Sequence, residues 1–228
     1  MKKITHILGL AGLTLLIFSC NSANLGEKAE TTDAAEVQEI EGDKMVYALN
    51  DDGSIIEWTG SKPTGTHNGT IAVERGELFV KDGKIAGGEF VIDMKSIVNF
   101  DLEDEEWNTK LVNHLHSEDF FHTDIYPEAK FVITNVEEFS GTVNEGAPVP
   151  THTITGNLTM KEITKSIKFN AMVDLNENSI SAESVPFVID RTLWDVKFKS
   201  KKIFNNLQDD FIHDDIGLKI IIDSKLRS

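Results

Sequence analysis

The histidines are the residues of this chain best suited to acid–base or metal chemistry. Three of the seven lie close together: His114, His116 two positions later, and His122 six further on. Side chains two positions apart on a helix point about 200° away from each other, so His114 and His116 would not share a metal ion there. His67 and His152 stand alone in the sequence. We therefore predict no metal site and expect ordinary hydrogen bonds for these rings.

Carboxylates gather in two places. Residues 101–106 (DLEDEE) hold five of them, and residues 209–215 (DDFIHDD) hold four. A pair of carboxylates could act in glycoside hydrolysis, but acidic residues ahead of a helical pattern are typical of a solvated helix start. The second cluster lacks the spaced ligands of a calcium loop. We predict that both clusters are solvated.

Arg191 is one of three arginines and lies in an aromatic stretch between Asp190 and Trp194. Its planar guanidinium could stack on the indole or pair with Asp195. It could also bind an anionic head group, and the sequence leaves both roles open, with the structural role favoured.

Sequence motifs for known catalytic sites are missing. The chain has no phosphate-binding loop, no nucleophile elbow and no cysteine pair. We therefore expect no enzymatic chemistry and no cofactor. An enzyme that uses His67, His114 or His116 stays as an alternative, which would require those rings to converge in the fold.

Cys20, the only cysteine, ends an apolar run that follows Lys2 and Lys3. The run is too short to span a bilayer and has the layout of a secretory signal. Residues 17–20 (IFSC) resemble the lipobox of bacterial lipoproteins, although Phe18 is bulky for its position. This resemblance implies a signal peptide over residues 1–19 and lipid attachment at Cys20. With Asn21 next, it implies a protein anchored at the outer membrane and facing the periplasm.

The charge distribution limits the partners that the chain can bind. The net charge is −16, and it becomes about −18 if residues 1–19 are removed. Such a chain lacks the basic footprint of a nucleic-acid-binding protein, so we expect membrane contact only through the anchor. Residues 20–43 are acidic and carry no aromatic residue, which predicts a disordered tether. One folded domain then covers residues 44–228.

Most of this domain shows the alternation of apolar and polar residues that is typical of strands. The alternating runs cover residues 55–60, 70–80, 84–94, 129–136, 151–160, 166–175, 184–190, 193–198 and 217–223. Such a series predicts an all-β, antiparallel sheet of about eight strands that curls or closes. Residues 105–116 instead have helical spacing and predict a short excursion that lids or plugs the sheet. We also expect a helical turn near residues 207–212.

Six motifs in sequence order resemble those of the YceI-like family. Residues 65–69 (GTHNG) resemble its G-x-H-x-G, and residues 88–97 (GEFVIDMKSI) its G-x-F-x-V-D-M-x-S-I. Residues 114–121 (HLHSEDFF), 126–131 (YPEAKF), 156–161 (GNLTMK) and 189–194 (IDRTLW) resemble the later motifs. The resemblance covers about residues 45–223. Glu162 and Asp195 replace glycines that are common in the family, which affects local turns.

This resemblance implies an extended, lipocalin-like barrel that binds an isoprenoid chain or a similar lipid. The residues carried over as ligand-binding from the matched motifs are His67, Phe90, His114, Leu115, Phe120, Phe121, Phe131, Arg191 and Trp194. The expected partners are this lipid and the membrane, with a homodimer left open. One further alternative stays open, because the dry-face side chains could instead fill the barrel and leave an interaction module that binds no ligand.

Overall fold

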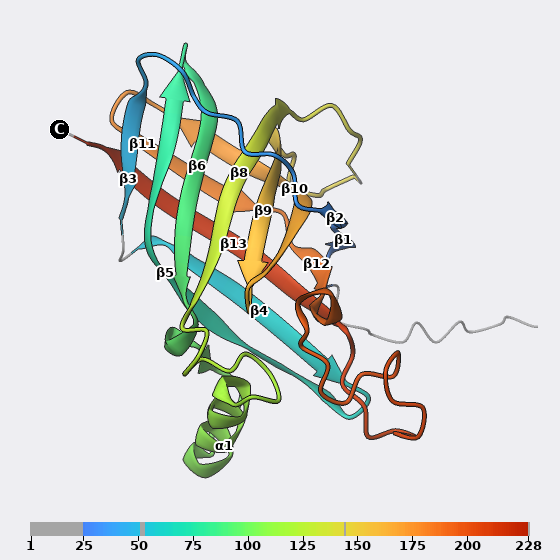
Figure 1. The fold of residues 1–228 in the computed structure, drawn as a ribbon. Coiled ribbons are helices and arrows are strands. Elements are labelled where there is room, and N and C mark those ends of the chain that lie inside the picture. The colour runs from blue at the N-terminus through green and yellow to red at the C-terminus, as the bar shows by residue number, and fades with distance from the viewer. Residues whose placement is uncertain (1–24, 51–52, 144, 228) are drawn as a thin grey trace, which may run out of the picture.

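Antiparallel β-structure dominates the fold in the computed structural model, which describes residues 25–50, 53–143 and 145–227 (Figure 1). Thirteen strands form a single sheet in this part of the chain. The strands are β1 (Glu27–Lys28), β2 (Glu30–Asp33), β3 (Met45–Leu49), β4 (Ile55–Lys62), β5 (Gly65–Lys81), β6 (Lys84–Asp93), β7 (Val98–Asn99), β8 (Glu128–Glu138), β9 (His152–Met160), β10 (Ile163–Leu175), β11 (Ser179–Ser184), β12 (Phe187–Asp190) and β13 (Asp215–Leu226). Among the described residues there is one α-helix, α1 (Glu105–His116).

The sheet closes into a barrel, as predicted. Strand β13 pairs with β3 and β4, and both of these also pair with β5, so no free edge remains at that seam. Eight strand positions follow one another around the barrel, as expected. Six of them hold one strand each, β3 and β4 together occupy the seventh, and β11 and β12 together occupy the eighth. A register shift between Val73 and Arg75 lets the long strand β5 bend, so that it pairs with β4 along its first half and with β3 along its second half.

The prediction of a disordered tether over residues 20–43 is wrong for residues 27–33, which form two strands. Strand β1 pairs in parallel with β12, and β2 pairs antiparallel with the first half of β10. These two strands fill the wedge that opens where β12 diverges from β10. Ala29 between them is buried in the core, and its backbone N–H donates to the Val188 carbonyl at 2.8 Å.

The chain then crosses the outer face of the barrel toward β3 (Figure 1). Ala35 exchanges two hydrogen bonds with the Asn157 side chain, at 2.9 and 2.8 Å. Further along, Ile40 lies over Gly87, where an added Cβ would approach its Cδ1 to 2.9 Å. Gly26 at the start adopts φ +98°, and an added Cβ there would lie 2.0 Å from the Pro186 carbonyl oxygen. Residues 27–33 are therefore part of the barrel wall, and residues 34–41 lie along its outer face.

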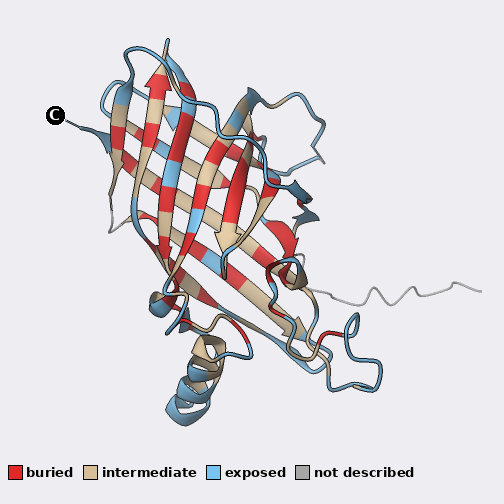
Figure 2. Cartoon of the chain, in the orientation of Figure 1, coloured by how far each residue is buried: buried red, intermediate tan, exposed pale blue. Residues whose placement is uncertain are grey.

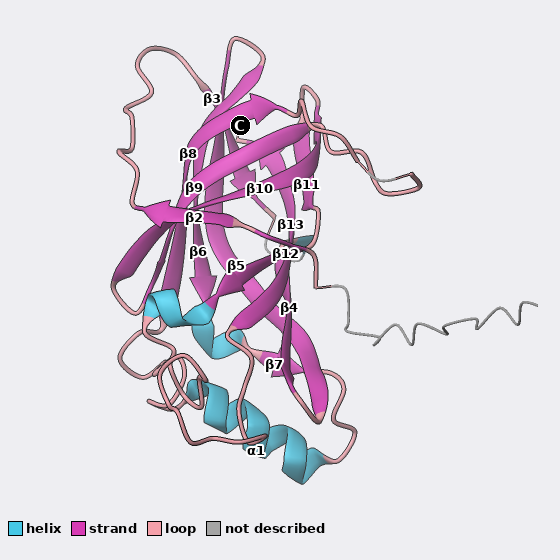
Figure 3. Cartoon of the chain, turned by 90° about the vertical axis from the view of Figure 1, so that its right-hand side faces the viewer, coloured by secondary structure: helices cyan, strands magenta, loops and turns pink. Residues whose placement is uncertain are grey.

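Helix α1 forms where the sequence predicts it and lies at one end of the barrel (Figure 3). Asp104 caps it by accepting a hydrogen bond from the Trp107 backbone N–H at 3.0 Å. None of its residues is fully buried, and Trp107 is 58% exposed. In the part of the chain that is described, no helix is long and apolar enough to cross a bilayer.

Two local predictions are wrong. Residues 193–198 alternate like a strand, but the structure has a 3-10 turn, Arg191–Trp194, followed by turns. Residues 207–212 form turns and no helix. This whole connection between β12 and β13 lies at the same end of the barrel as α1 (Figure 1).

Side chains on the inner face of the barrel form the hydrophobic core, and Figure 2 shows buried positions alternating with intermediate or exposed ones along the strands. The alternation follows because successive strand residues point to opposite faces. One face is dry, as predicted.

Candidate ligand-binding site

The barrel encloses a space whose inner part is lined almost entirely by apolar side chains and whose outer part is lined by apolar and polar ones. It has an outer part of about 690 Å³ at the end that carries α1, and a narrow inner part of about 90 Å³. Ile56, Ile92, Leu158 and Leu218 line both parts, so the two adjoin. A volume of this size is typical of small-ligand pockets.

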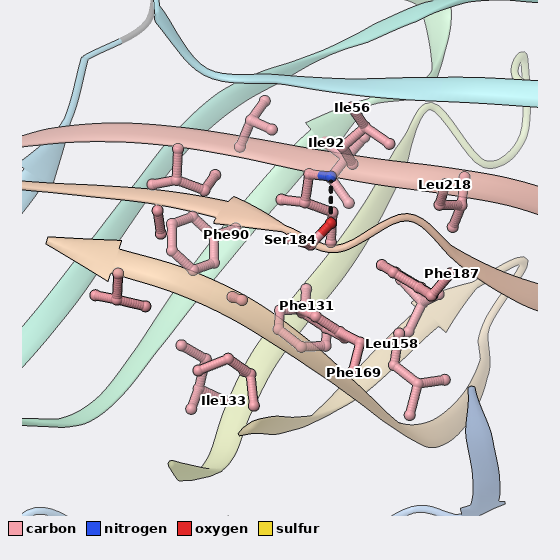
Figure 4. Close-up of a pocket in the computed structure, with 18 of the residues that line it drawn as sticks. Ile56, Phe90, Ile92, Phe131, Ile133, Leu158, Phe169, Ser184, Phe187 and Leu218 are labelled. Carbon is pink, nitrogen blue, oxygen red and sulfur yellow. Dashed lines mark hydrogen bonds between the residues drawn. The ribbon is translucent and has the colours of Figure 1, made fainter. Parts of the chain in front are cut away.

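Aromatic rings narrow the inner part (Figure 4). Phe169 stacks on Phe187 with ring centroids 4.7 Å apart, and it also lies 5.8 Å from Phe131. Small residues, among them Ala171 and Ala182, line the same space. The inner part is therefore a narrow apolar space that accepts only a slender apolar group.

The outer part is walled by two segments that lie outside the strand pattern. Helix α1 and the turn after it contribute Leu111, Leu115, Phe120 and Phe121. The connection between β12 and β13 contributes further lining residues, namely Phe198, Lys199, Leu207, Gln208, Asp209, Asp210, Phe211, Ile212 and His213. The prediction that residues 105–116 form a lid on the sheet is confirmed. The connection between β12 and β13 forms a second lid segment.

His67 lines the outer part and is held by a carboxylate. Its Nδ1 lies 2.8 Å from Asp101 Oδ2, and both side chains are 27% exposed. Burial alone would raise the pKa of Asp101, but hydrogen bonds from the Asn68 backbone N–H, His67 and Asn99 outweigh it and lower the pKa below its usual value. Asn108 of α1 donates to the Asn99 carbonyl at 3.0 Å, which ties the helix to this cluster.

His114 lines the same outer part and has a similar arrangement. Its Nε2 lies 3.0 Å from Asp119 Oδ2. The edges of Phe120 and Phe198 pack against the ring with centroids 5.0 and 4.8 Å away. The ring is thus fixed between the two lid segments. His116, in contrast, does not line the cavity but lies 3.2 Å through Nδ1 from the buried hydroxyl of Thr123.

Arg191 borders the outer part, but its side chain is 1% exposed and bonds to the protein. The guanidinium donates to four backbone carbonyls at 2.7–3.1 Å, those of Val196, Phe198, Ile212 and His213. Burial lowers the pKa of this group, and Asp214 and Asp190 act in the opposite direction. Of the two roles left open by the sequence, the structure supports the structural one. Arg191 holds the second lid segment in place, and its partners differ from the expected Trp194 and Asp195.

Trp194 is not among the described residues that line the cavity, so its prediction as a ligand contact is not supported. It is fully buried, and its indole N–H donates to the Leu158 carbonyl at 3.0 Å. The structure brings the other predicted residues to the cavity, with Phe90 and Phe131 in the inner part and His67, His114, Leu115, Phe120 and Phe121 in the outer part. Sequence reasoning missed Phe198 and Phe211 as lining residues, because residues 193–198 alternate like a strand and the residues around Phe211 have no periodic pattern.

Metal chemistry has no visible support in residues 25–50, 53–143 and 145–227. Within these ranges no group of three His, Cys, Asp or Glu side chains could hold a metal ion. The partners of His67 and His114 there are carboxylates, where a nucleophilic site would have a hydroxyl or a thiol.

A closed antiparallel barrel with an apolar interior and a polar rim is the architecture of lipocalin-like barrels. The YceI-like domain matches residues 47–223, and the chain therefore belongs to this family. The resemblance noted in the sequence is confirmed.

Individual relatives agree with this assignment. A UPF0312 protein of Photorhabdus laumondii is 41% identical over 58 residues, an alignment that spans about a quarter of each chain, 25% of this one and 26% of the relative. The crystal structure of Burkholderia cenocepacia BcnA has a TM-score of 0.54 at 17% identity and covers 77% of this chain and 98% of its own. A polyisoprenoid binding domain from Saccharophagus degradans, implicated in plant cell wall breakdown, has a TM-score of 0.54 at 15% identity and covers 79% and 98%. These structures show the same fold.

Proposed function

We propose that this protein binds an isoprenoid or a similarly long apolar lipid in its barrel, for transport or storage. The observation that carries the proposal is the pair of adjoining cavities, an outer one of about 690 Å³ and a narrow apolar inner one. A barrel filled by its own side chains would leave no such space, which argues against the interaction module. Support also comes from the polyisoprenoid binding domain that shares the fold.

The free energy of such binding comes from removing the chain from water. Each buried CH2 group contributes about 0.8 kcal/mol, so a five-carbon isoprene unit contributes about 4 kcal/mol before the costs of ordering. The walls of the inner part supply almost only apolar contacts, and the polar groups lie in the outer part. Length and slenderness of the ligand would therefore matter more than polar recognition, except at the rim.

We further infer that the protein is exported and anchored by lipid at Cys20 in the outer membrane, where it faces the periplasm. The support is the lipobox-like sequence of residues 17–20 and the following Asn21. These residues lie outside the part of the chain that the structure describes. The homodimer likewise stays a prediction.

Mass spectrometry of organic extracts tests the binding function. The protein to use is the mature chain, residues 20–228, with Cys20→Ser, because residues 27–33 belong to the barrel wall. We expect one isoprenoid or similar lipid per protein, released on denaturation. A clean extract, together with no thermal stabilisation by added prenyl lipids, would contradict the proposal.

The anchor is tested separately by fractionating cells that express the full chain. We expect the wild-type protein in the outer-membrane fraction and the Cys20→Ser variant outside it. The same distribution for both proteins would overturn the anchor and leave the binding function untouched.

A further inference from the structure

The two histidines of the outer cavity have a common arrangement that points to the chemistry of the ligand head group. His67 comes from β5, and His114 comes from α1. Each ring borders the outer part of the cavity, and each has one nitrogen on a carboxylate, at 2.8 Å in His67 and 3.0 Å in His114.

These carboxylates determine which ring nitrogen carries the hydrogen. An ionised carboxylate accepts hydrogen bonds and cannot donate, so Nδ1 of His67 carries the hydrogen that bonds to Asp101. In the neutral ring this leaves Nε2 as a lone-pair acceptor. By the same argument, Nε2 of His114 donates to Asp119, and Nδ1 is left as the acceptor.

The His67 pair is held especially firmly. Asp101 also accepts from the Asn68 backbone N–H at 2.8 Å and from Asn99 Nδ2 at 2.6 Å. Asn99 is buried and is bonded in turn to Asn108 of α1. The carboxylate is therefore fixed by the backbone of β5 and by the helix, which fixes the ring that it holds.

Charge at the rim gives no comparable site for an anion. The lining residues include Lys62 and Lys199, but also Asp209 and Asp210. Lys199 Nζ lies 2.6 Å from Asp210 Oδ2. Arg191, the remaining lining cation, donates to backbone carbonyls. A diphosphate head group would meet balanced charges, whereas a hydroxyl would meet acceptors.

We propose that His67, assisted by His114, selects lipids whose head group donates a hydrogen bond, namely a free alcohol or a phenol at the end of the apolar chain. The inference rests on the proposed lipid-binding function and adds the class of head group. Asp101 and Asp119 are then positioning residues, because they orient the two histidine rings and do not contact the lipid themselves.

A matched pair of ligands tests this without altering the protein. Geranylgeraniol and its methyl ether have the same chain and the same oxygen, but only the alcohol can donate a hydrogen bond. We expect the mature Cys20→Ser chain to bind the alcohol three- to tenfold more tightly than the ether, the range of one net hydrogen bond. Displacement of a fluorescent lipid measures both affinities.

Variants then locate the acceptor. His67→Phe keeps a ring but removes the acceptor, and it should bring the alcohol-to-ether ratio close to one while the ether still binds. Asp101→Asn should lower the ratio part of the way, because it frees the tautomer of His67. The control is His152→Phe, since His152 bonds to Thr151 at the start of β9 and does not line the described cavity. Its ratio should equal that of the parent chain.

The outcomes separate the two proposals. Equal affinity of the parent chain for alcohol and ether would overturn this inference alone, as would tighter binding of geranylgeranyl phosphate than of the alcohol. Binding of none of these lipids would overturn the lipid-binding function and this inference with it.

Discussion

At the scale of single residues, Arg191 shows how one buried cation can organise a segment that has no regular structure. Its guanidinium contacts carbonyls on both sides of the connection between β12 and β13. A planar fork of five donors suits this task, whereas the compact ammonium of lysine does not. The wall of the outer cavity therefore depends on a residue that does not need to touch the ligand.

We expect Arg191→Met to lower the free energy of unfolding by about 3 kcal/mol or more, because it leaves several buried carbonyls without donors. Arg191→Lys should recover only part of this loss. Urea unfolding followed by circular dichroism measures the change. Arg75→Met is the matched control, since Arg75 is 54% exposed in its ion pairs with Glu74 and Glu128 and should change stability by less than about 1 kcal/mol. Equal losses for the two variants would contradict this role.

His116 gives a prediction of pH dependence. Burial lowers the pKa of His116, Asp124 and Asp93 oppose the shift, and Lys95 adds to it. The unfolded chain then binds the proton more tightly than the folded one, so stability falls as the pH drops from the unfolded value near 6.5 to the lower folded value.

We expect the wild-type protein to lose stability between pH 7 and pH 5, with a slope from this residue of at most about 1.4 kcal/mol per pH unit. His116→Gln should have a shallower slope over this range, and its difference from wild type should be constant above pH 7.5, where the ring is neutral in both states. Parallel curves for the two proteins at all pH values would show that His116 is not responsible.

At the scale of elements, the sequence predicts those whose cause is local. The alternation of Phe90 and Ile92 marks β6, because a strand of a closed barrel has one dry face. Helix α1 is predicted because Asp104 caps it and its apolar residues recur at helical spacing. Each of these signals lies within about a dozen residues.

The elements that sequence reasoning missed are set by long-range contacts. Strands β1 and β2 have two and four residues, too few to show a period, and their environment is supplied by β12 and β10. The alternation over residues 193–198 is misleading because Trp194 and Val196 are both buried by a chain that turns. Beyond residue 198 the second lid segment has no periodic pattern, and Arg191 at its start holds it through carbonyls that lie up to 22 residues further along the chain.

The N-terminal segment should therefore contribute to stability. Ala29→Glu places a carboxylate in the core between β12 and β10, and we expect it to lower the free energy of unfolding by about 2–3 kcal/mol. Thr32→Glu, at an exposed position of the neighbouring strand, should stay within about 0.5 kcal/mol of wild type. If both substitutions were neutral, residues 25–33 would not be part of the folded wall in solution.

At the scale of the whole molecule, the shape of the cavity limits the length of the ligand. The outer part is wide, and the inner part is narrow and has small residues and stacked phenylalanines among its lining residues. A ligand whose head lies at the rim beside His67 would reach the inner part only if its chain is long. A larger side chain in the inner part should therefore weaken the binding of long chains more than the binding of short ones.

Ala182→Leu adds three carbons to the inner part of the cavity. We expect it to weaken binding of the 20-carbon geranylgeraniol by about tenfold, the equivalent of two displaced CH2 groups. Binding of the 10-carbon geraniol, which would end in the outer part, should stay within about twofold. The neighbouring Ser181 is exposed on the opposite face of β11, so Ser181→Leu is the control and should change neither affinity.

Titration of both alcohols against the parent chain, Ala182→Leu and Ser181→Leu shows where the tail of the ligand lies. Circular dichroism establishes that each protein is folded. A loss confined to the longer chain would place the tail of the ligand in the inner part and its head at the rim. An equal loss for both chains would instead mean that short and long ligands use the same space. The length of the lipid would then be limited by the outer part, where α1 and the connection between β12 and β13 form the walls.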